Sequence, residues 1–150
     1  MSITFEEFQE MIKQSEAGGA CNQTIRELKT FKSVEEFESH KWAPYWTYWY
    51  ARNTIKGRFS GGEHIISKDS YYSYWYAENV IKGRFPEGEY IIADSASHSY
   101  WYAKDVLKER FINGEKTIKN NKFFWNEYKE HFKIEEDQPI LLSELLKRSP

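Results

Sequence analysis

Aromatic, small and aliphatic residues recur along the chain in a fixed order, with polar positions between them. The segment YWYARNTIKGRF, residues 48–59, returns as YWYAENVIKGRF at 74–85 and as YWYAKDVLKERF at 100–111. Each copy begins 26 residues after the one before, because 74 − 48 and 100 − 74 both equal 26. A fixed period without insertions is typical of structural repeats that stack on their neighbours.

The apolar positions within one copy predict a helix. At about 100° per residue, four side chains of the second copy fall on one arc, which we expect to be the core face: Tyr76, Ala77, Val80 and Ile81. We expect Ala77 and its equivalents, Ala51 and Ala103, to let neighbouring helices approach closely.

Residues that can cap a helix precede each copy. Three of them share one register position: Asp69, Ser95 and Asn121. Their side-chain oxygens can accept from the free N–H groups of a first helical turn, so a long helix is expected to start after each. Gly57 and Gly83 are expected to take the left-handed conformation that often ends a helix. Glu109 replaces this glycine in the third copy, so we expect that helix to run on or to end differently.

A turn and a short apolar stretch follow each long helix, as in FPEGEYIIAD, residues 85–94. Each copy is therefore expected to form a helical hairpin. One hairpin cannot bury its apolar face alone, so the hairpins must stack and need capping segments at both ends.

Both capping segments can be recognised in the sequence. The capping-box spacing of Thr4–Glu7 and Ser33–Glu36 predicts helices over about residues 5–15 and 34–40, and another is expected near 22–31. At the other end, FFWNEYKEHF keeps Tyr128 in register and indicates a degenerate fourth copy. The final segment, PILLSELLKR, carries leucines at helical spacing: Leu141, Leu142, Leu145 and Leu146.

These patterns predict a single all-α domain of stacked helical hairpins, a short solenoid of repeats of about 26 residues with an N-terminal helical cap. The cap would span residues 1–44 and three tandem repeats residues 45–122. Residues 123–150 would hold the degenerate repeat and a C-terminal cap.

Composition narrows the function more than the fold. The 150 residues include 21 Lys and Arg and 23 Asp and Glu, a net charge of −2, so no global positive field favours nucleic acid. The single cysteine, Cys21, excludes an intramolecular disulfide, and we expect its side chain to be buried. No signal peptide and no apolar stretch long enough to cross a membrane are seen, so we expect a cytoplasmic protein.

Signatures of an enzyme are missing from the sequence. The four histidines lack the paired spacing of a metal site, and His98 aligns with Tyr72 and Phe124, as an ordinary repeat position would. The glycines of SGGE recur partly in PEGE and NGE, which favours turns over a phosphate-binding loop. We therefore expect a protein that is not an enzyme, without catalytic residues, metal or cofactor.

One stripe of the long helices is the candidate binding site. The tryptophan of each copy falls on the polar side of the helix, among charged residues. The stripe consists of Trp49, Trp75, Trp101, Arg52, Lys56, Glu78, Lys82, Lys104 and Lys108. It is either a surface that contacts a partner or part of the core between repeats, since aromatic residues dominate both.

A second set of charges also follows the period. Arg58, Arg84 and Arg110 each stand five residues before a glutamate: Glu63, Glu89 and Glu115. Because the acidic partner recurs as regularly as the base, we expect a pairing that fixes the turn or bridges adjacent repeats, rather than a phosphate-binding stripe. Lys56, Lys82 and Lys108 have no such partner in register and are better candidates for an outward basic stripe.

The segment YAENVIKGRFPEGEYII resembles a short helical repeat of small bacterial and phage proteins, written Tyr-Ala-x-x-Val-Ile-Lys-Gly-Arg-Trp/Phe-Pro-x-x-Glu, and the resemblance covers residues 48–122. Residues 20–51 are similar to a phage-associated N-terminal module with an Ala-Cys pair, Ser-x-Glu-Glu and paired tryptophans. The resemblance implies a phage or mobile-element accessory protein, located in the host cytoplasm if phage-encoded. It implies no catalytic residue.

We therefore expect a protein-binding module that binds and inhibits a host or defence protein. The alternative is a single-stranded nucleic-acid-binding repeat protein, in which the tryptophans stack on bases and Lys56, Lys82 and Lys108 follow the backbone. A homo-oligomer is compatible with either function.

Overall fold

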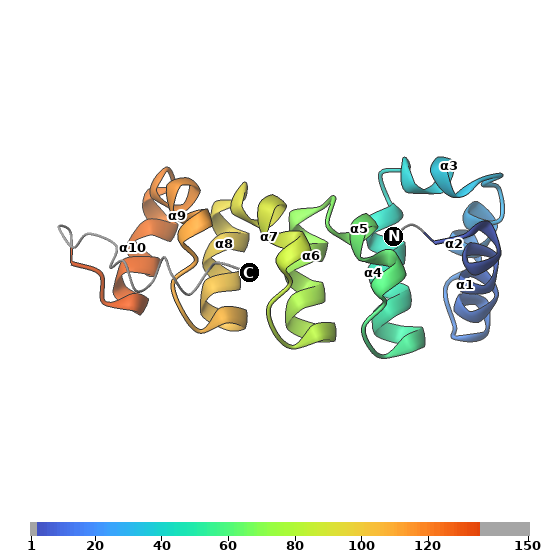
Figure 1. Cartoon of the computed structure of the whole chain (residues 1–150), viewed down its shortest axis with the longest axis horizontal. Coiled ribbons are helices and arrows are strands. Elements are labelled where there is room, and N and C mark those ends of the chain that lie inside the picture. The colour runs from blue at the N-terminus through green and yellow to red at the C-terminus, as the bar shows by residue number, and fades with distance from the viewer. Residues whose placement is uncertain (1–2, 136–150) are drawn as a thin grey trace.

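Every regular element in the described part of the chain is helical. The computed structural model describes residues 3–135, and in this range the chain forms α-helices, π-helical turns and a 3₁₀ turn, with no strand. The prediction of an all-α fold is confirmed. Figure 1 shows the helices side by side in chain order along the long axis, from α1 at one end to α10 at the other.

Short helices make up the described part of the N-terminal cap. They are α1 (Phe5–Ala17), α2 (Asn22–Leu28) and α3 (Val34–Glu38). Their positions agree with the predicted ranges, and α2 and α3 end earlier than expected.

The two predicted capping boxes differ in the structure. At α1 the box is complete, because the Thr4 hydroxyl accepts from the N–H of Glu7 and the Glu7 carboxylate accepts from the N–H of Thr4. At α3 it is half formed. The Ser33 hydroxyl accepts from the N–H of Glu36 at 3.2 Å, but the Glu36 carboxylate accepts from the N–H of Lys32 at 2.9 Å.

Each of the three tandem repeats begins with a long helix that changes from α to π in its last turns, where hydrogen bonds span five residues instead of four. These helices are α4 (Ala43–Tyr50) with η1 (Ala51–Ile55), α6 (Ser70–Tyr76) with η3 (Ala77–Ile81), and α8 (Ala96–Trp101) with η4 (Tyr102–Leu107). The predicted N-caps Asp69, Ser95 and Asn121 are confirmed, since each side chain accepts from the N–H three residues ahead.

A short second helix completes each hairpin. These helices are α5 (Glu63–Ile66), entered through the 3₁₀ turn η2 (Ser60–Gly62), α7 (Pro86–Ala93) and α9 (Ile112–Lys119); α10 (Lys122–Phe132) is the first helix of the fourth copy. First helices contact one another in the order α4, α6, α8, α10, and second helices in the order α5, α7, α9.

The long helices reverse direction at a lysine. The prediction that Gly57 and Gly83 are left-handed is wrong, because positive φ angles of 56°, 56° and 58° belong to the preceding residues: Lys56, Lys82 and Lys108. The widened turn brings the N–H groups of Lys82 and Gly83 onto the same carbonyl, that of Ala77, so the chain reverses at Lys82 itself. Glu109 therefore follows the reversal, and the third helix ends in the same register as the others, contrary to expectation.

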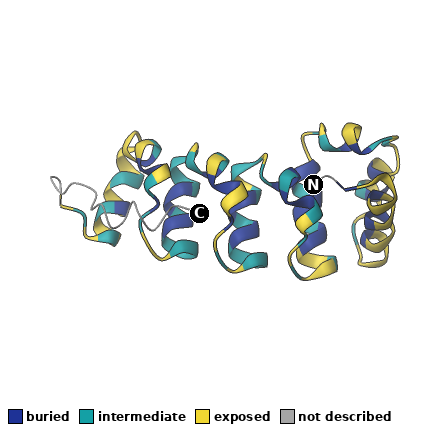
Figure 2. Ribbon diagram, viewed as in Figure 1, coloured by how far each residue is buried: buried dark blue, intermediate teal, exposed yellow. Residues whose placement is uncertain are grey.

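Buried residues occur in every helix of the row (Figure 2). One apolar cluster joins the N-terminal cap to α4 and α5, and another continues through the repeats to α10. Of the predicted core positions, Tyr76 and Ala77 are fully buried, whereas Val80 and Ile81 lie half-buried against the cluster.

None of the helices found in residues 3–135 is both long and apolar enough to cross a bilayer. The leucines predicted to form a C-terminal cap, at positions 141, 142, 145 and 146, lie outside the described residues.

Candidate binding surface

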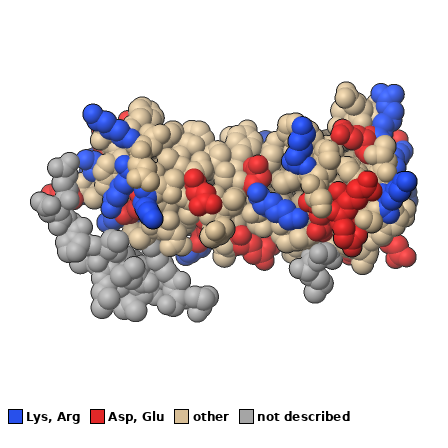
Figure 3. All heavy atoms as spheres, turned by 90° about the horizontal axis from the view of Figure 1, so that it is seen from above, with Lys and Arg blue, Asp and Glu red and all other residues tan. Residues whose placement is uncertain are grey.

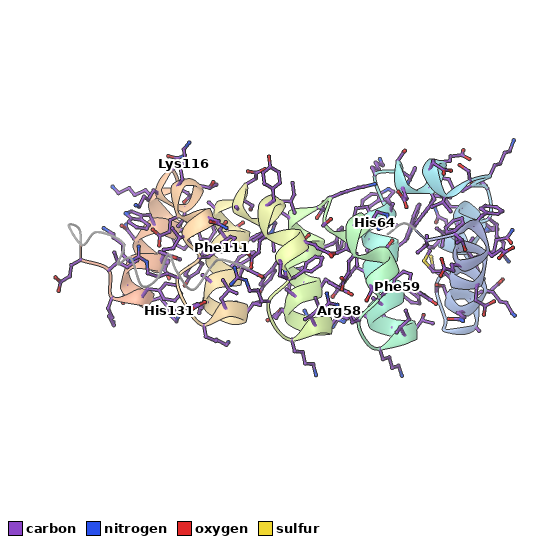
Figure 4. All side chains as sticks on the ribbon, viewed as in Figure 1. Arg58, Phe59, His64, Phe111, Lys116 and His131 are labelled. Carbon is purple, nitrogen blue, oxygen red and sulfur yellow. The ribbon has the colours of Figure 1, made fainter. Side chains whose placement is uncertain are left out.

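A hydrogen-bonded arrangement recurs wherever one repeat meets the next. Arg58 binds Glu63 through two bonds, Nε to Oε1 at 2.6 Å and Nη2 to Oε2 at 2.9 Å. Tyr76, on the following helix, donates its hydroxyl to Glu63 Oε1 at 3.0 Å and accepts from the N–H of Phe59 at 2.8 Å. Figure 4 labels Arg58 and Phe59 beside α4. We call this set of four residues the tyrosine joint.

Two further joints repeat the same contacts. They consist of Arg84, Phe85, Glu89 and Tyr102, and of Arg110, Phe111, Glu115 and Tyr128. The predicted arginine–glutamate pairing is present in all three joints, and the tyrosine makes it a bridge between repeats. The prediction that Tyr128 keeps the register of the earlier copies is confirmed.

The joints are buried on their acidic and aromatic sides. The glutamate side chains are 3–8% exposed. Burial raises the pKa of the three joint tyrosines, Tyr76, Tyr102 and Tyr128, above the ordinary value of about 10. In the first copy, the equivalent Tyr50 donates to Gln14 Oε1 of α1 at 2.6 Å and so connects the repeats to the cap.

The three predicted tryptophans are half-buried. Trp75 and Trp101 pack against the repeat core, and the Trp101 ring lies 6.0 Å from that of Tyr74 and 6.1 Å from that of Phe124, in the hairpins before and after it. The Trp75 indole N–H is buried without an acceptor among the described residues. Trp49 lines a hollow beside the cap. The tryptophans therefore take part in packing between hairpins and are still partly accessible.

The charged residues of the predicted stripe lie in two places. Those at the reversals are exposed: Lys56, Lys82 and Lys108. The others lie within the π turns: Arg52 Nη1 donates to the Tyr48 hydroxyl at 3.0 Å, and Lys104 Nζ lies 5.6 Å from the centre of the Tyr100 ring. Glu78 accepts from its neighbour in sequence. The charged residues of the stripe thus occupy two positions of each long helix, the π turn and the reversal that follows it.

A different set of rings forms an unbroken path across the repeats. Successive ring centres lie 5.1–6.4 Å apart along Trp42, Tyr45, Tyr72, Tyr71, His98, Trp101, Phe124 and Phe123. We call this set the aromatic surface. Most of its members stand at the start or in the first turn of α4, α6, α8 and α10, so the stacking of the helices brings them into line.

Part of the aromatic surface is open to solvent. Trp42 and Tyr71 are each 46% exposed and Phe123 is 65% exposed. Sequence reasoning missed these residues, because it took the tryptophan of each copy as the candidate and treated His98 as an ordinary position. The 26-residue register could have found most of them, since residues 45, 71 and 123 are equivalent, as are 46, 72, 98 and 124.

His98 connects two hairpins within this surface. Its Nδ1 lies 2.9 Å from the Ser70 hydroxyl, and its ring stacks on that of Tyr74 with centres 6.3 Å apart. Burial lowers the pKa of His98 below its ordinary value. The lowered pKa favours the neutral imidazole, which is less costly to bury among aromatic rings than the charged form.

Charged side chains are distributed unevenly on the face seen from above in Figure 3. Acidic side chains gather over the N-terminal helices, and the middle of that face is largely uncharged. Within residues 3–135, no three His, Cys, Asp or Glu side chains are grouped as metal ligands would be.

The prediction that Cys21 is buried is wrong. Its side chain is exposed because it caps α2, where Sγ accepts from the N–H of Thr24 at 3.4 Å. Hydrogen bonds from Thr24, first from its hydroxyl, lower the pKa of the thiol.

Comparisons of the chain with protein-family models, with curated proteins and with solved structures found no match. The resemblance to a bacterial and phage helical repeat therefore stays a prediction.

Proposed function

We propose that this protein is a short solenoid of stacked hairpins that binds a partner protein through the aromatic surface and catalyses no reaction. The observation that carries the proposal is the continuous ring path with strongly exposed members, Trp42, Tyr71 and Phe123. Large rings on a rigid helical support lose little conformational freedom on binding, and they dominate the energetics of protein interfaces.

The partner is better described as a protein than as a nucleic acid. Most of the rings lie at the N-terminal ends of the long helices, whereas the exposed lysines at the reversals lie at the C-terminal ends. From Tyr72 to Lys82 the rise along the helix is about 15 Å. A single strand would need its bases on the rings and its phosphates on the cations at the same time. The near-neutral net charge also favours a protein partner.

The resemblance to phage repeats gives the proposal its setting, in which the partner is a host or defence protein and binding inhibits it. A surface made from equivalent positions of successive hairpins is typical of repeat proteins that act by binding.

The double variant Tyr71→Ala/Phe123→Ala tests the proposal. Both side chains are exposed, so the helical circular dichroism signal and the urea midpoint should change little. Capture of a specific host protein from a nuclease-treated bacterial lysate, identified by mass spectrometry, should be lost.

The matched control is Tyr90→Ala, which removes an 82% exposed tyrosine from α7, the second helix of its hairpin. It should capture the same protein as the wild type. Equal capture by the double variant and the wild type would exclude the aromatic surface as the binding site. Capture that disappears on nuclease treatment would support nucleic acid instead.

A further inference from the structure

Two adjoining hollows lie at the N-terminal end of the aromatic surface, the inner one between α1, α2 and α4 and the outer one between α2, α4 and α6. The inner hollow has a volume of about 250 Å³ and the outer hollow about 270 Å³. They share four wall residues: Cys21, Thr24, Tyr45 and Trp46. The outer hollow also includes Trp42 and Tyr72, so it opens directly onto the aromatic surface.

The inner hollow has a largely apolar wall that carries a serine hydroxyl. Met11, Leu28 and Trp49 contribute to the wall, and none of the described residues that line it is charged. Ser15 also lines it and is 3% exposed, and its hydroxyl, which makes no hydrogen bond to the described residues, is not among the fully buried unpaired atoms, so it is open to the hollow. A hydroxyl on the wall of an apolar hollow can donate to or accept from an occupant, so the Ser15 hydroxyl suits an occupant with a polar atom on an otherwise apolar body.

The size of the hollows indicates side chains rather than a whole small molecule. Sites for small molecules usually measure about 300–1,000 Å³. A volume of about 250 Å³ suits one large side chain, such as the anchors that fill pockets at protein interfaces. Among the described residues that line the outer hollow, Glu27 is the charged one, so the flank of an occupant there is neutral or basic, not acidic.

We propose that the two hollows hold two neighbouring side chains of the partner protein, with a tryptophan or tyrosine in the inner hollow bonded to the Ser15 hydroxyl and an apolar side chain in the outer one. This rests on the proposed function, in which the rest of the partner lies on the aromatic surface. Tryptophan and tyrosine combine an apolar body with a polar edge that needs a partner when it is buried.

Cys21 provides a direct measure of occupancy. It is the single cysteine of the chain, is exposed, and lies in the wall shared by both hollows. Its lowered thiol pKa favours the thiolate that reacts with iodoacetamide. A molecule that fills either hollow should shield Sγ and slow the alkylation.

The experiment measures the alkylation rate of Cys21 with N-acetyl-tryptophanamide, N-acetyl-tyrosinamide, N-acetyl-phenylalaninamide or N-acetyl-alaninamide present. The aromatic amides should slow the reaction in a saturable way, to about half the free rate when their concentration equals Kd, which we expect in the millimolar range. The tyrosine amide should bind more tightly than the phenylalanine amide, and the alanine amide should have no effect. An equal effect of all four amides would overturn the proposal.

Two variants of Ser15 locate the effect. Ser15→Leu fills the inner hollow and should abolish protection by the tryptophan amide, whereas Ala17→Leu, at an exposed position of the same helix, should preserve it. Ser15→Ala keeps the space, so it should retain protection but lose the preference for tyrosine over phenylalanine, and it carries the test if Ser15→Leu does not fold. Protection that survives Ser15→Leu, or a preference that survives Ser15→Ala, would contradict the assignment.

This test is independent of the proposed function. The Tyr71→Ala/Phe123→Ala variant should keep the amide protection of Cys21 even though it loses capture of the partner. If the amides do not slow the alkylation of Cys21, only the proposal for the two hollows is contradicted. If the double variant still captures the partner, only the assignment of the aromatic surface is contradicted.

Discussion

Gly88 packs so closely against its neighbours that a larger residue does not fit. A Cβ atom there would lie 2.5 Å from Cδ1 of Phe85 and 2.9 Å from Cβ of Ser73. The equivalent Gly114 has the same problem, with Ser99 Oγ at 2.5 Å. These glycines, in the first turns of α7 and α9, therefore serve close contact between the two helices of a hairpin.

Gly88→Ala should destabilise the protein by about 1–3 kcal/mol, as overpacking does in a tight core. The direction of the stability change is informative, because without a close contact alanine in a helix is favoured over glycine by about 1 kcal/mol. Urea denaturation would measure the change, and a variant more stable than the wild type would show that the contact relaxes at little cost.

Gly83→Ala should have little effect or stabilise the protein by about 0.4–1 kcal/mol, because it restricts the unfolded chain without straining the native one. No atom of residues 3–135 is found within 4 Å of a Cβ at this position beyond its chain neighbours, and its φ is not positive. A left-handed Gly83, as the sequence predicted, would give a marked loss instead. The same urea titration distinguishes the two.

At the residue scale, the sequence predicted caps well and reversals poorly. Asp69 and Thr4 act through their own side chains, so their residue type carries the information. The reversal at Lys82 depends on a widened turn that no single residue encodes. A glycine one position later was therefore a misleading signal.

At the element scale, the tyrosine joints hold neighbouring hairpins in register. Tyr102→Phe should cost about 1–3 kcal/mol, because it leaves the N–H of Phe85 buried without an acceptor and removes a donor from Glu89. Tyr90→Phe, at an 82% exposed ring, should change the free energy of unfolding by less than about 0.5 kcal/mol. Indistinguishable urea midpoints for the two variants would show that the joint hydroxyl contributes nothing to stability.

The joints also predict a loss of stability in alkali. The pKa of Tyr76, Tyr102 and Tyr128 is raised in the folded state, so above about pH 10 the folded protein holds protons that the unfolded chain has released. Their contribution is complete below that pH. Above it, the free energy of unfolding should fall by about 1.4 kcal/mol per pH unit for each ring.

Urea titrations at a series of pH values from 8 upward would measure this fall, and Tyr102→Phe should show a shallower one. A slope that is the same in the variant and the wild type would assign the alkaline loss to other groups.

The aromatic surface shows why a helical wheel was insufficient at this scale. The wheel placed Trp75 on a polar side, but Tyr74, which it left outside the core arc, is 4% exposed because it packs on His98 of the next hairpin. A wheel describes one helix, whereas these contacts arise between helices. The register carried the missing information, at positions the wheel did not consider.

At the scale of the whole molecule, the 26-residue period predicted a chain of helices that recur at equivalent positions, and the described residues are all-helical in their regular elements. The period could not predict the two hollows, because their walls combine residues of α1 and α2, which lie outside the repeated pattern, with residues of α4 and α6. Such a site depends on how the cap meets the first repeat, and Tyr50 and Gln14 are part of that contact.

The constant spacing of the tyrosine joints predicts that the chain can be shortened by one complete repeat. Each joint tyrosine lies 13 residues after its glutamate and 17 after its phenylalanine. Deleting residues 74–99 would therefore place Tyr102 opposite Glu63 and Phe59 at that same spacing. The shortened chain should keep its helical circular dichroism signal and unfold cooperatively at a lower temperature, with one joint fewer. Deleting one residue fewer, 74–98, should abolish the folded state, because every later residue would be shifted by one position relative to its partner in the first repeat.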